Sequence, residues 1–190
     1  MSHFFAYMSR MKHIKRWGLM RNNEEENIQE HSLQVAMVAH CLGLIENKYF
    51  GGKTNPEHIM ALAVYHETSE VITGDLATPI KYFNRKINGA YKEIEDIAEN
   101  KMISFLPEDF QEDYRQIIKK PDAEEYRYVK AADRICAYTK CMEELKSGNR
   151  EFAKARETIE ASIHEMNMPC VEYFMKEFIP SFDLTLDELI

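Results

Sequence analysis

Hydrophobic and polar residues alternate along this chain with the period of an α-helix, and no stretch shows the strict alternation of a half-buried strand. Asn55-Pro56 is a typical helix start, and Gly74 is a typical helix end. The pattern predicts helices over residues 3–15, 27–46, 56–73, 79–83, 88–105, 108–120, 122–146 and 151–167. We therefore expect an all-α fold in which residues 1–190 form a single-domain helical bundle.

One predicted helix changes from apolar to polar along its length, within residues 59–72. If this helix is continuous, His66 and Glu70 lie on one face, one turn apart. Glu67 directly follows His66 and points about 100° further round the helix. Three ionisable groups at the end of a buried helix cost free energy unless they pair with one another or bind a metal. This stretch is therefore the first candidate for chemistry.

Two other ionisable residues fall on apolar helix faces. His31 lies four residues before Val35, on or beside the apolar stripe of the helix over residues 27–46. Asp133 falls on the stripe of the helix over residues 122–146. Taken alone, a histidine in this position is more often a hydrogen-bonded core residue than a ligand, and an aspartate is usually at the surface.

Taken together, His31, His66, Glu67 and Asp133 supply two imidazoles and two carboxylates from three predicted helices. Mixed nitrogen and oxygen ligands suit Co²⁺, Mn²⁺, Zn²⁺, Fe²⁺ or Mg²⁺. Such a site leaves coordination positions open for water and substrate. The four residues indicate one divalent metal ion.

Composition limits the classes of protein that fit. The chain has 190 residues and a net charge of −8, which argues against general nucleic-acid binding. No apolar run approaches the ~18 residues that span a bilayer, and the N-terminal residues lack the order of a signal peptide. The four cysteines form no CxxC pair, so we expect a reduced, cytoplasmic protein.

Positive charge gathers near the N-terminus, where residues 1–23 contain five lysines and arginines and no acid. A small anionic ligand and a solvated helix face both fit this patch. Residues 16–23 interrupt the helical pattern and predict a loop that contains Trp17, the sole tryptophan. Beside Arg16, this side chain is either a core anchor or a flat wall for a ring.

Several motif segments together resemble a known family. The order His, His plus an acid, then a distant Asp is similar to that of the HD-domain metal-dependent phosphohydrolases. The resemblance is to their bacterial 5′-deoxynucleotidase branch, and it covers nearly the whole chain. It is carried by residues 16–17, 30–36, 65–71, 73–79, 130–133 and 180–182.

The resemblance implies hydrolysis of deoxyribonucleoside 5′-monophosphates to deoxynucleoside and phosphate. It implies that His31, His66, Glu67 and Asp133 bind the metal. Arg16 would hold the phosphate, and Trp17 would pack on the sugar and exclude a 2′-hydroxyl. Glu70 and Asp75 would handle protons. The implied substrate-binding residues are Arg16, Trp17, Glu67, Asp75, Leu76, Ala77, Thr78 and Asp133.

One departure from the family pattern is Glu67, which stands where the family has Asp. It leaves open a non-catalytic nucleotide-binding module with an altered metal site. A second alternative is an HD phosphohydrolase for another nucleotide phosphate ester. The apolar C-terminal tail and the resemblance both favour a homodimer. The tail residues are Phe174, Phe178, Phe182, Leu184 and Leu186.

Overall fold

The computed structural model describes residues 1–81, 83–119 and 123–190, and these residues contain α- and 3₁₀-helices but no β-strand. The all-α expectation is confirmed. The α-helices are α1 (Phe4–Met8), α2 (Ile28–Tyr49), α3 (Pro56–Val64), α4 (Glu70–Thr73), α5 (Thr78–Lys81), α6 (Arg85–Ser104), α7 (Glu108–Ile118), α8 (Ala123–Lys146), α9 (Ala153–His164) and α10 (Pro169–Glu177). The 3₁₀-helices are η1 (Ser9–His13), η2 (Arg150–Phe152), η3 (Ile179–Asp183) and η4 (Leu186–Glu188).

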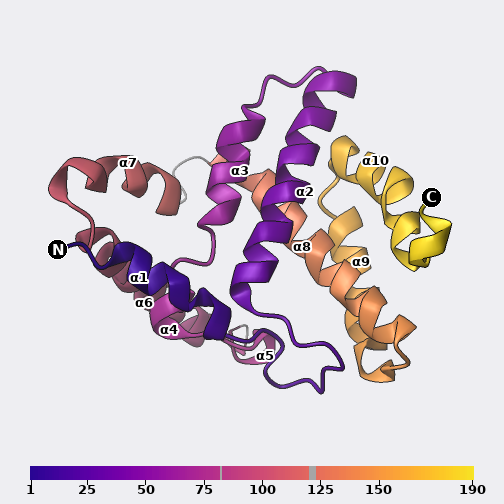
Figure 1. Ribbon diagram of the computed structural model, residues 1–190, viewed down its shortest axis with the longest axis horizontal. Coiled ribbons are helices and arrows are strands. Elements are labelled where there is room, and N and C mark those ends of the chain that lie inside the picture. The colour runs from indigo at the N-terminus through magenta and orange to yellow at the C-terminus, as the bar shows by residue number, and fades with distance from the viewer. Residues whose placement is uncertain (82, 120–122) are drawn as a thin grey trace.

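The centre of the molecule is built from α2, α3 and α8. In Figure 1, α2 and α3 stand side by side and α8 crosses them, with α9 and α10 on one side and α1, α6 and α7 on the other. The predicted apolar stripes fill the core between these three helices, because Val35, Leu42, Leu62 and Ile135 are all fully buried. Burial of this apolar surface is the main force that holds the bundle together.

Gly43 lets α2 and α3 approach closely. A Cβ atom added there would lie 3.2 Å from both Ile59 Cδ1 and Pro56 Cα. Side-chain capping fixes the start of each helix, since Asn27 accepts hydrogen bonds from backbone amides of α2 and Asn55 accepts one from α3. Both predicted starts are confirmed to within a residue.

The helix predicted over residues 56–73 is wrong in its second half. It ends at Val64, a turn covers residues 65–69, and α4 starts at Glu70. Side chains in this segment bond to its own backbone: Thr68 Oγ1 donates to the Tyr65 carbonyl at 2.6 Å. Such local bonds compete with the helical ladder and stabilise a turn instead. His66 and Glu70 therefore do not lie on one face of one helix.

Other expectations hold in part. The helix predicted over residues 3–15 is α1 followed by η1, and the loop predicted over residues 16–23 is present. The C-terminal tail packs on the core through Phe174 and Ile179, but Leu186 is 80% exposed.

Predictions that fall on residues 82 and 120–122 lie outside the described part of the chain. Within the described residues, the helices are too short or too polar to cross a bilayer.

A buried carboxylate anchors the loop over residues 16–26 to the end of α8. Glu144, only 1% exposed, accepts hydrogen bonds from the backbone amides of Asn23 at 2.9 Å and Glu24 at 3.1 Å. It also accepts from Asn149 Nδ2 at 2.7 Å and from the buried Lys140 Nζ at 2.5 Å. One side chain thus fixes the position of the loop that contains Arg16 and Trp17.

Removing this anchor should destabilise the fold. In Glu144→Ala the buried ammonium of Lys140 loses its carboxylate partner, and we expect the free energy of unfolding to fall by about 3–5 kcal/mol. Glu143→Ala, at the exposed neighbouring position, is the matched control and should change it by less than about 0.5 kcal/mol. Urea denaturation measures both. Equal midpoints for the two variants would contradict the anchoring role.

The same carboxylate should make stability depend on acidity. Burial acts to raise the pKa of Glu144, but hydrogen bonds from Lys140, Asn23 and Asn149 outweigh it and hold the pKa at about 2, below the ordinary 4.5. A lowered folded-state pKa stabilises the fold above the unfolded pKa and loses that effect as pH falls. Between pH 4.5 and 2, the wild type should therefore lose stability more steeply than Glu144→Gln in parallel urea titrations.

Candidate functional site

Four potential metal ligands converge where α2, α8 and the turn after α3 meet. His31 lies on α2, His66 and Glu67 lie in the turn, and Asp133 lies on α8. One nitrogen or oxygen atom from each lies within 4.8 Å of the corresponding atoms of the other three. The structure therefore brings together the residues that the sequence singled out, although two of them come from a turn and not from a helix.

The pairwise distances show how tightly these atoms cluster. His31 Nε2 lies 2.9 Å from Asp133 Oδ1 and 4.0 Å from Glu67 Oε1. His66 Nε2 lies 3.1 Å from the same Glu67 oxygen. The Asp133 side chain is 42% exposed, so the cluster opens to solvent on that side, whereas His31 is fully buried. Such a site has protein ligands on one side and open space on the other.

The orientation of His66 fits a metal ligand. Its Nδ1 lies 2.7 Å from the Ala63 carbonyl oxygen, which can only accept, so Nδ1 carries a proton and Nε2 is the ring atom left to face the cluster. His66 Nε2 is buried and makes no hydrogen bond of good geometry among the described residues, although Glu67 Oε1 lies 3.1 Å away. A buried imidazole nitrogen that faces the carboxylates of Glu67 and Asp133 suits a divalent cation, so the residues present fit such an ion.

Arg16 brings one fixed positive charge to the edge of this cluster. Its Nη1 lies 3.5 Å from Glu67 Oε1 and its Nη2 lies 4.0 Å from Asp133 Oδ1, with only 12% of the side chain exposed. Burial disfavours the charge, but Asp133, Glu67 and Glu26 outweigh it and raise the pKa of Arg16. The guanidinium is therefore always charged and available to an anion in the pocket.

The carboxylates divide into ionised and protonated groups. Burial opposes ionisation at Asp133, yet contact with His31 and the charge of Arg16 lower its pKa to about 2. His66 and Arg16 likewise hold the pKa of Glu67 well below its usual range against the effect of burial. Glu70 behaves in the opposite way, because burial and the charges of Glu67 and Asp75 raise its pKa to about 10. Two potential ligands are thus anionic beside a carboxyl that holds its proton.

A cavity of about 690 Å³ opens beside the cluster, and its volume suits a nucleotide-sized ligand. Loop residues 16–20 form one wall, and α8 and α9 form another with Ala137, Ala155 and Ile159. Seven of the eight residues expected to bind substrate line it, and so does Glu70, which was expected to handle protons. The seven are Arg16, Trp17, Glu67, Asp75, Leu76, Ala77 and Asp133. The eighth is Thr78, whose side chain lies outside the described part of the structure.

Trp17 packs against a core residue and also lines the cavity. It has a left-handed backbone conformation with φ of 59° and packs its ring against Phe152, with ring centroids 5.3 Å apart. The indole also lines the cavity. Its Nε1 donates a hydrogen bond of 3.0 Å to Glu26, a buried residue that sequence reasoning missed. No periodicity marks Glu26, since it precedes α2 in a run of three glutamates.

Comparison with known proteins agrees with the class that this fold and site define, the HD-domain phosphohydrolases. A solved HD-domain phosphohydrolase from Listeria innocua superposes with a TM-score of 0.83 at 27% identity, covering 95% of this chain and 88% of that one. A cyanophage S-2L HD phosphohydrolase, solved with dA and one catalytic Zn²⁺, shares the fold with a TM-score of 0.70 at 17% identity, covering 95% of this chain and 96% of that one.

Within that class, the chain belongs to the YfbR-like 5′-deoxynucleotidase family, whose model matches residues 3–182. A 5′-deoxynucleotidase of Vibrio parahaemolyticus is 54% identical over 99% of this chain and 98% of its own length. One of Yersinia pestis is 52% identical over 100% and 97% respectively. The chain is therefore an enzyme of this family, as the sequence resemblance predicted.

The orientation of His66 generates a prediction about metal binding. His66→Ala removes the unpaired Nε2, and we expect the affinity for Co²⁺ or Mn²⁺ to fall more than tenfold. Titration calorimetry on metal-stripped protein measures the affinity, and the absorption of bound Co²⁺ reports its coordination. His40→Ala, a half-buried histidine of α2 outside the cluster, is the control. Unchanged affinity in His66→Ala would contradict the assignment.

Proposed function

We propose that this protein hydrolyses deoxyribonucleoside 5′-monophosphates to deoxynucleoside and phosphate, with one divalent metal ion. The observation that carries this proposal is the position of Arg16, whose guanidinium reaches to within 3.5 Å of Glu67 and 4.0 Å of Asp133 at the edge of the cavity. A phosphate beside the four-residue cluster would meet the guanidinium there. Fixed positive charge at this place offsets the negative charge of the transferred phosphoryl group.

We propose His31, His66, Glu67 and Asp133 as the metal ligands. When bound, a divalent ion polarises a phosphoryl oxygen and lowers the pKa of a coordinated water. The mixed donor set is compatible with Co²⁺, Mn²⁺, Zn²⁺, Fe²⁺ or Mg²⁺. The single catalytic Zn²⁺ named for the cyanophage protein supports a one-metal site in this fold.

Selection of the sugar falls to the loop over residues 16–20. The indole of Trp17 is fixed by Phe152 and Glu26 and forms part of the cavity wall. In the proposed complex this rigid surface packs on the deoxyribose and leaves no space for a 2′-hydroxyl. The segment before and at the start of α5 completes the proposed substrate site with Asp75, Leu76, Ala77 and Thr78. The described side chains of this segment, Asp75 to Ala77, line the cavity.

Glu70 and Asp75 are the proposed proton-handling residues. Both line the cavity, and burial raises the pKa of each carboxyl. In the proposed reaction one of them orients or deprotonates the attacking water, and the carboxyl that deprotonates it must be ionised. A divalent ion bound beside Glu70 would favour its ionised form, because an opposite charge nearby lowers the pKa of a carboxyl. The two carboxyls face the same space as Arg16, so water, phosphate and leaving oxygen can be handled on one side of the cluster. No covalent intermediate is required.

Two alternatives make different demands on these residues. A hydrolase for another nucleotide phosphate ester would use the same metal cluster but needs room beyond one phosphate. A non-catalytic binding module has no need of Glu70 and Asp75, which nevertheless line the cavity beside the cluster. Their position favours the enzyme. The substitution at Glu67 leaves its Oε1 3.1 Å from His66, so the longer side chain still reaches the cluster.

We also propose that the protein is a cytoplasmic homodimer. The C-terminal segment leaves apolar side chains exposed, with Phe178 and Phe182 each 42% exposed and Leu186 80% exposed. A second copy of the chain would cover them and remove this surface from water. The four cysteines are all unpaired thiols, as is usual in a reducing compartment.

Phosphate release from a panel of nucleotides tests the proposed activity. Metal-stripped protein resupplied with Co²⁺, Mn²⁺, Mg²⁺ or Zn²⁺ should release phosphate from deoxyribonucleoside 5′-monophosphates far faster than from the ribonucleotides. Glu70→Gln should lower kcat about 10²–10⁴-fold, because a group that transfers protons is lost. Glu93→Gln, on the exposed face of α6, should match the wild type.

Substrate selectivity separates the alternatives. Trp17→Ala should lower the ratio of deoxynucleotide to ribonucleotide kcat/KM, because the wall beside the sugar is removed. Release only from triphosphates or cyclic nucleotides would favour the other hydrolase. Nucleotide binding without release at any metal would favour the binding module, and Glu67→Asp would then be the variant to assay for recovered activity.

A further inference from the structure

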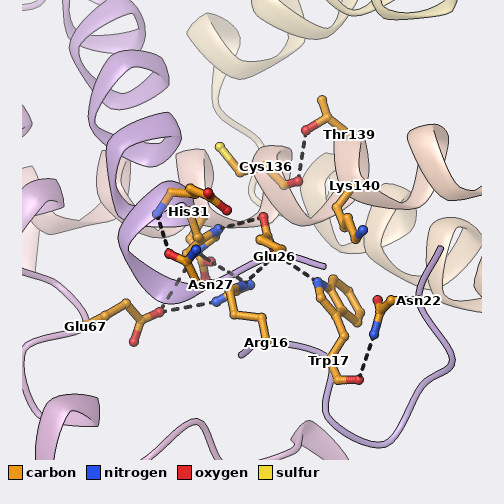
Figure 2. A network of polar contacts seen from close by, with 12 residues as sticks. Arg16, Trp17, Asn22, Glu26, Asn27, His31, Glu67, Cys136, Thr139 and Lys140 are labelled. Carbon is orange, nitrogen blue, oxygen red and sulfur yellow. Dashed lines mark hydrogen bonds and ion pairs between the residues drawn. The ribbon is translucent and has the colours of Figure 1, made fainter. Parts of the chain in front are cut away.

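Glu26 contacts Arg16, Trp17 and His31 through its carboxylate. It is 9% exposed and lies two residues before the start of α2, the helix that carries His31. Figure 2 shows its carboxylate between the side chains of Arg16, Trp17 and His31. These are the proposed phosphate, sugar and metal residues respectively.

The two carboxylate oxygens of Glu26 have different partners. Oε2 accepts hydrogen bonds from Arg16 Nε and from Trp17 Nε1, each at 3.0 Å. Oε1 faces His31 Nδ1 at 3.8 Å. Because Arg16 Nε donates to Glu26, the two terminal nitrogens of its guanidinium remain to face Glu67 and Asp133. The contact therefore sets which edge of the guanidinium points into the cavity.

Backbone pairing fixes the same geometry. Arg16 N donates to the Glu26 carbonyl oxygen at 2.9 Å, and an isolated antiparallel bridge joins Lys15 to Asn27. Trp17, the next residue, has a left-handed backbone that a non-glycine residue rarely adopts. Its indole packs on Phe152, and the Glu26 oxygen adds an acceptor at the ring nitrogen.

Glu26 also differs in kind from the other carboxylates around Arg16. Glu67 and Asp133 belong to the group that can hold a metal ion, whereas Glu26 does not. A bound cation competes with Arg16 for those two carboxylates but leaves its contact with Glu26 free of that competition. Glu26 is therefore the partner that can keep the guanidinium in place when the metal site is filled.

We propose that Glu26 is a positioning residue that orients Arg16 and Trp17 together, and so couples phosphate binding to the selection of deoxyribose. This inference rests on the proposed function of those two residues. It predicts that one carboxylate, without touching substrate, affects both the affinity for the monophosphate and the discrimination against ribonucleotides. A purely structural role predicts a lower Tm with unchanged selectivity.

The test compares Glu26→Gln with Glu25→Gln, its matched control. Glu25 is 70% exposed and pairs only at the surface with Lys15. For Glu26→Gln we expect KM for a deoxyribonucleoside monophosphate to rise about tenfold, because a charge-assisted hydrogen bond is lost. The ratio of deoxynucleotide to ribonucleotide kcat/KM should fall as well. Rates are divided by the measured metal content of each variant. A loss of metal caused by the changed contact with His31 is then not mistaken for a slower reaction.

Trp17 provides a readout that does not require activity. It is the sole tryptophan, so the intrinsic fluorescence spectrum of the protein reports its indole alone. Loss of the charged acceptor at Nε1 should shift the emission of Glu26→Gln but leave that of Glu25→Gln unchanged. If Glu26→Gln folds poorly, Trp17→Phe tests the Trp17 side of the contact, because it removes the N–H donor together with the five-membered ring. It should lower the selectivity ratio while raising KM by less than the tenfold expected for Glu26→Gln.

The outcomes separate the two proposals. If the wild type releases no phosphate from any monophosphate, the proposed function fails, and the emission shift alone decides whether Glu26 holds Trp17. If the wild type is active and Glu26→Gln equals Glu25→Gln in KM, selectivity and emission, the role of Glu26 is overturned. The role is also overturned if Glu26→Gln changes the selectivity ratio as strongly in a Trp17→Phe background as in the wild type.

Discussion

The arrangement of this site depends on the balance between several clustered carboxylates and one guanidinium. Glu26, Glu67 and Asp133 each have an oxygen within 4.0 Å of Arg16, and water screens charge poorly at the buried Glu26 and Glu67 but reaches Asp133. Buried charges of one sign are stable only when they are paired. The single arginine compensates three acids in part, and the remaining negative charge is what a divalent cation would neutralise. The electrostatics of the cluster thus favour both a metal ion and a phosphate that bridges the ion to Arg16.

Sequence periodicity predicted the long helices because their apolar stripes are regular. It placed His31 and Asp133 correctly on α2 and α8, and the structure brings them within 2.9 Å. It failed for residues 65–69, which were predicted as helix and form a turn, although His66 and Glu67 still lie in the cluster. Their bonds are to their own backbone, such as Thr68 to Tyr65, and such short-range competition leaves no periodic signal.

Glu26 shows a second limit of sequence reasoning. Its partners Arg16 and Trp17 are ten and nine residues earlier in the chain, and a short antiparallel bridge rather than a helix brings them together. Nothing in the spacing distinguishes it from Glu24 or Glu25, which precede it. Only the packed structure shows that one glutamate of the three turns inward. The roles of the metal and substrate residues themselves stay predictions that binding and activity measurements can test.

Helix α8 also sets the distance and the angle between Asp133 and Glu144. Asp133 lies at the metal cluster and Glu144 holds the loop that contains Trp17, and both side chains project from this one rigid rod. Each residue of a helix adds about 1.5 Å and 100° of rotation. A deletion or insertion between these two positions would turn one side chain away from its partners while leaving the other in place. The number of residues between Asp133 and Glu144 is therefore constrained by both ends of the site at once.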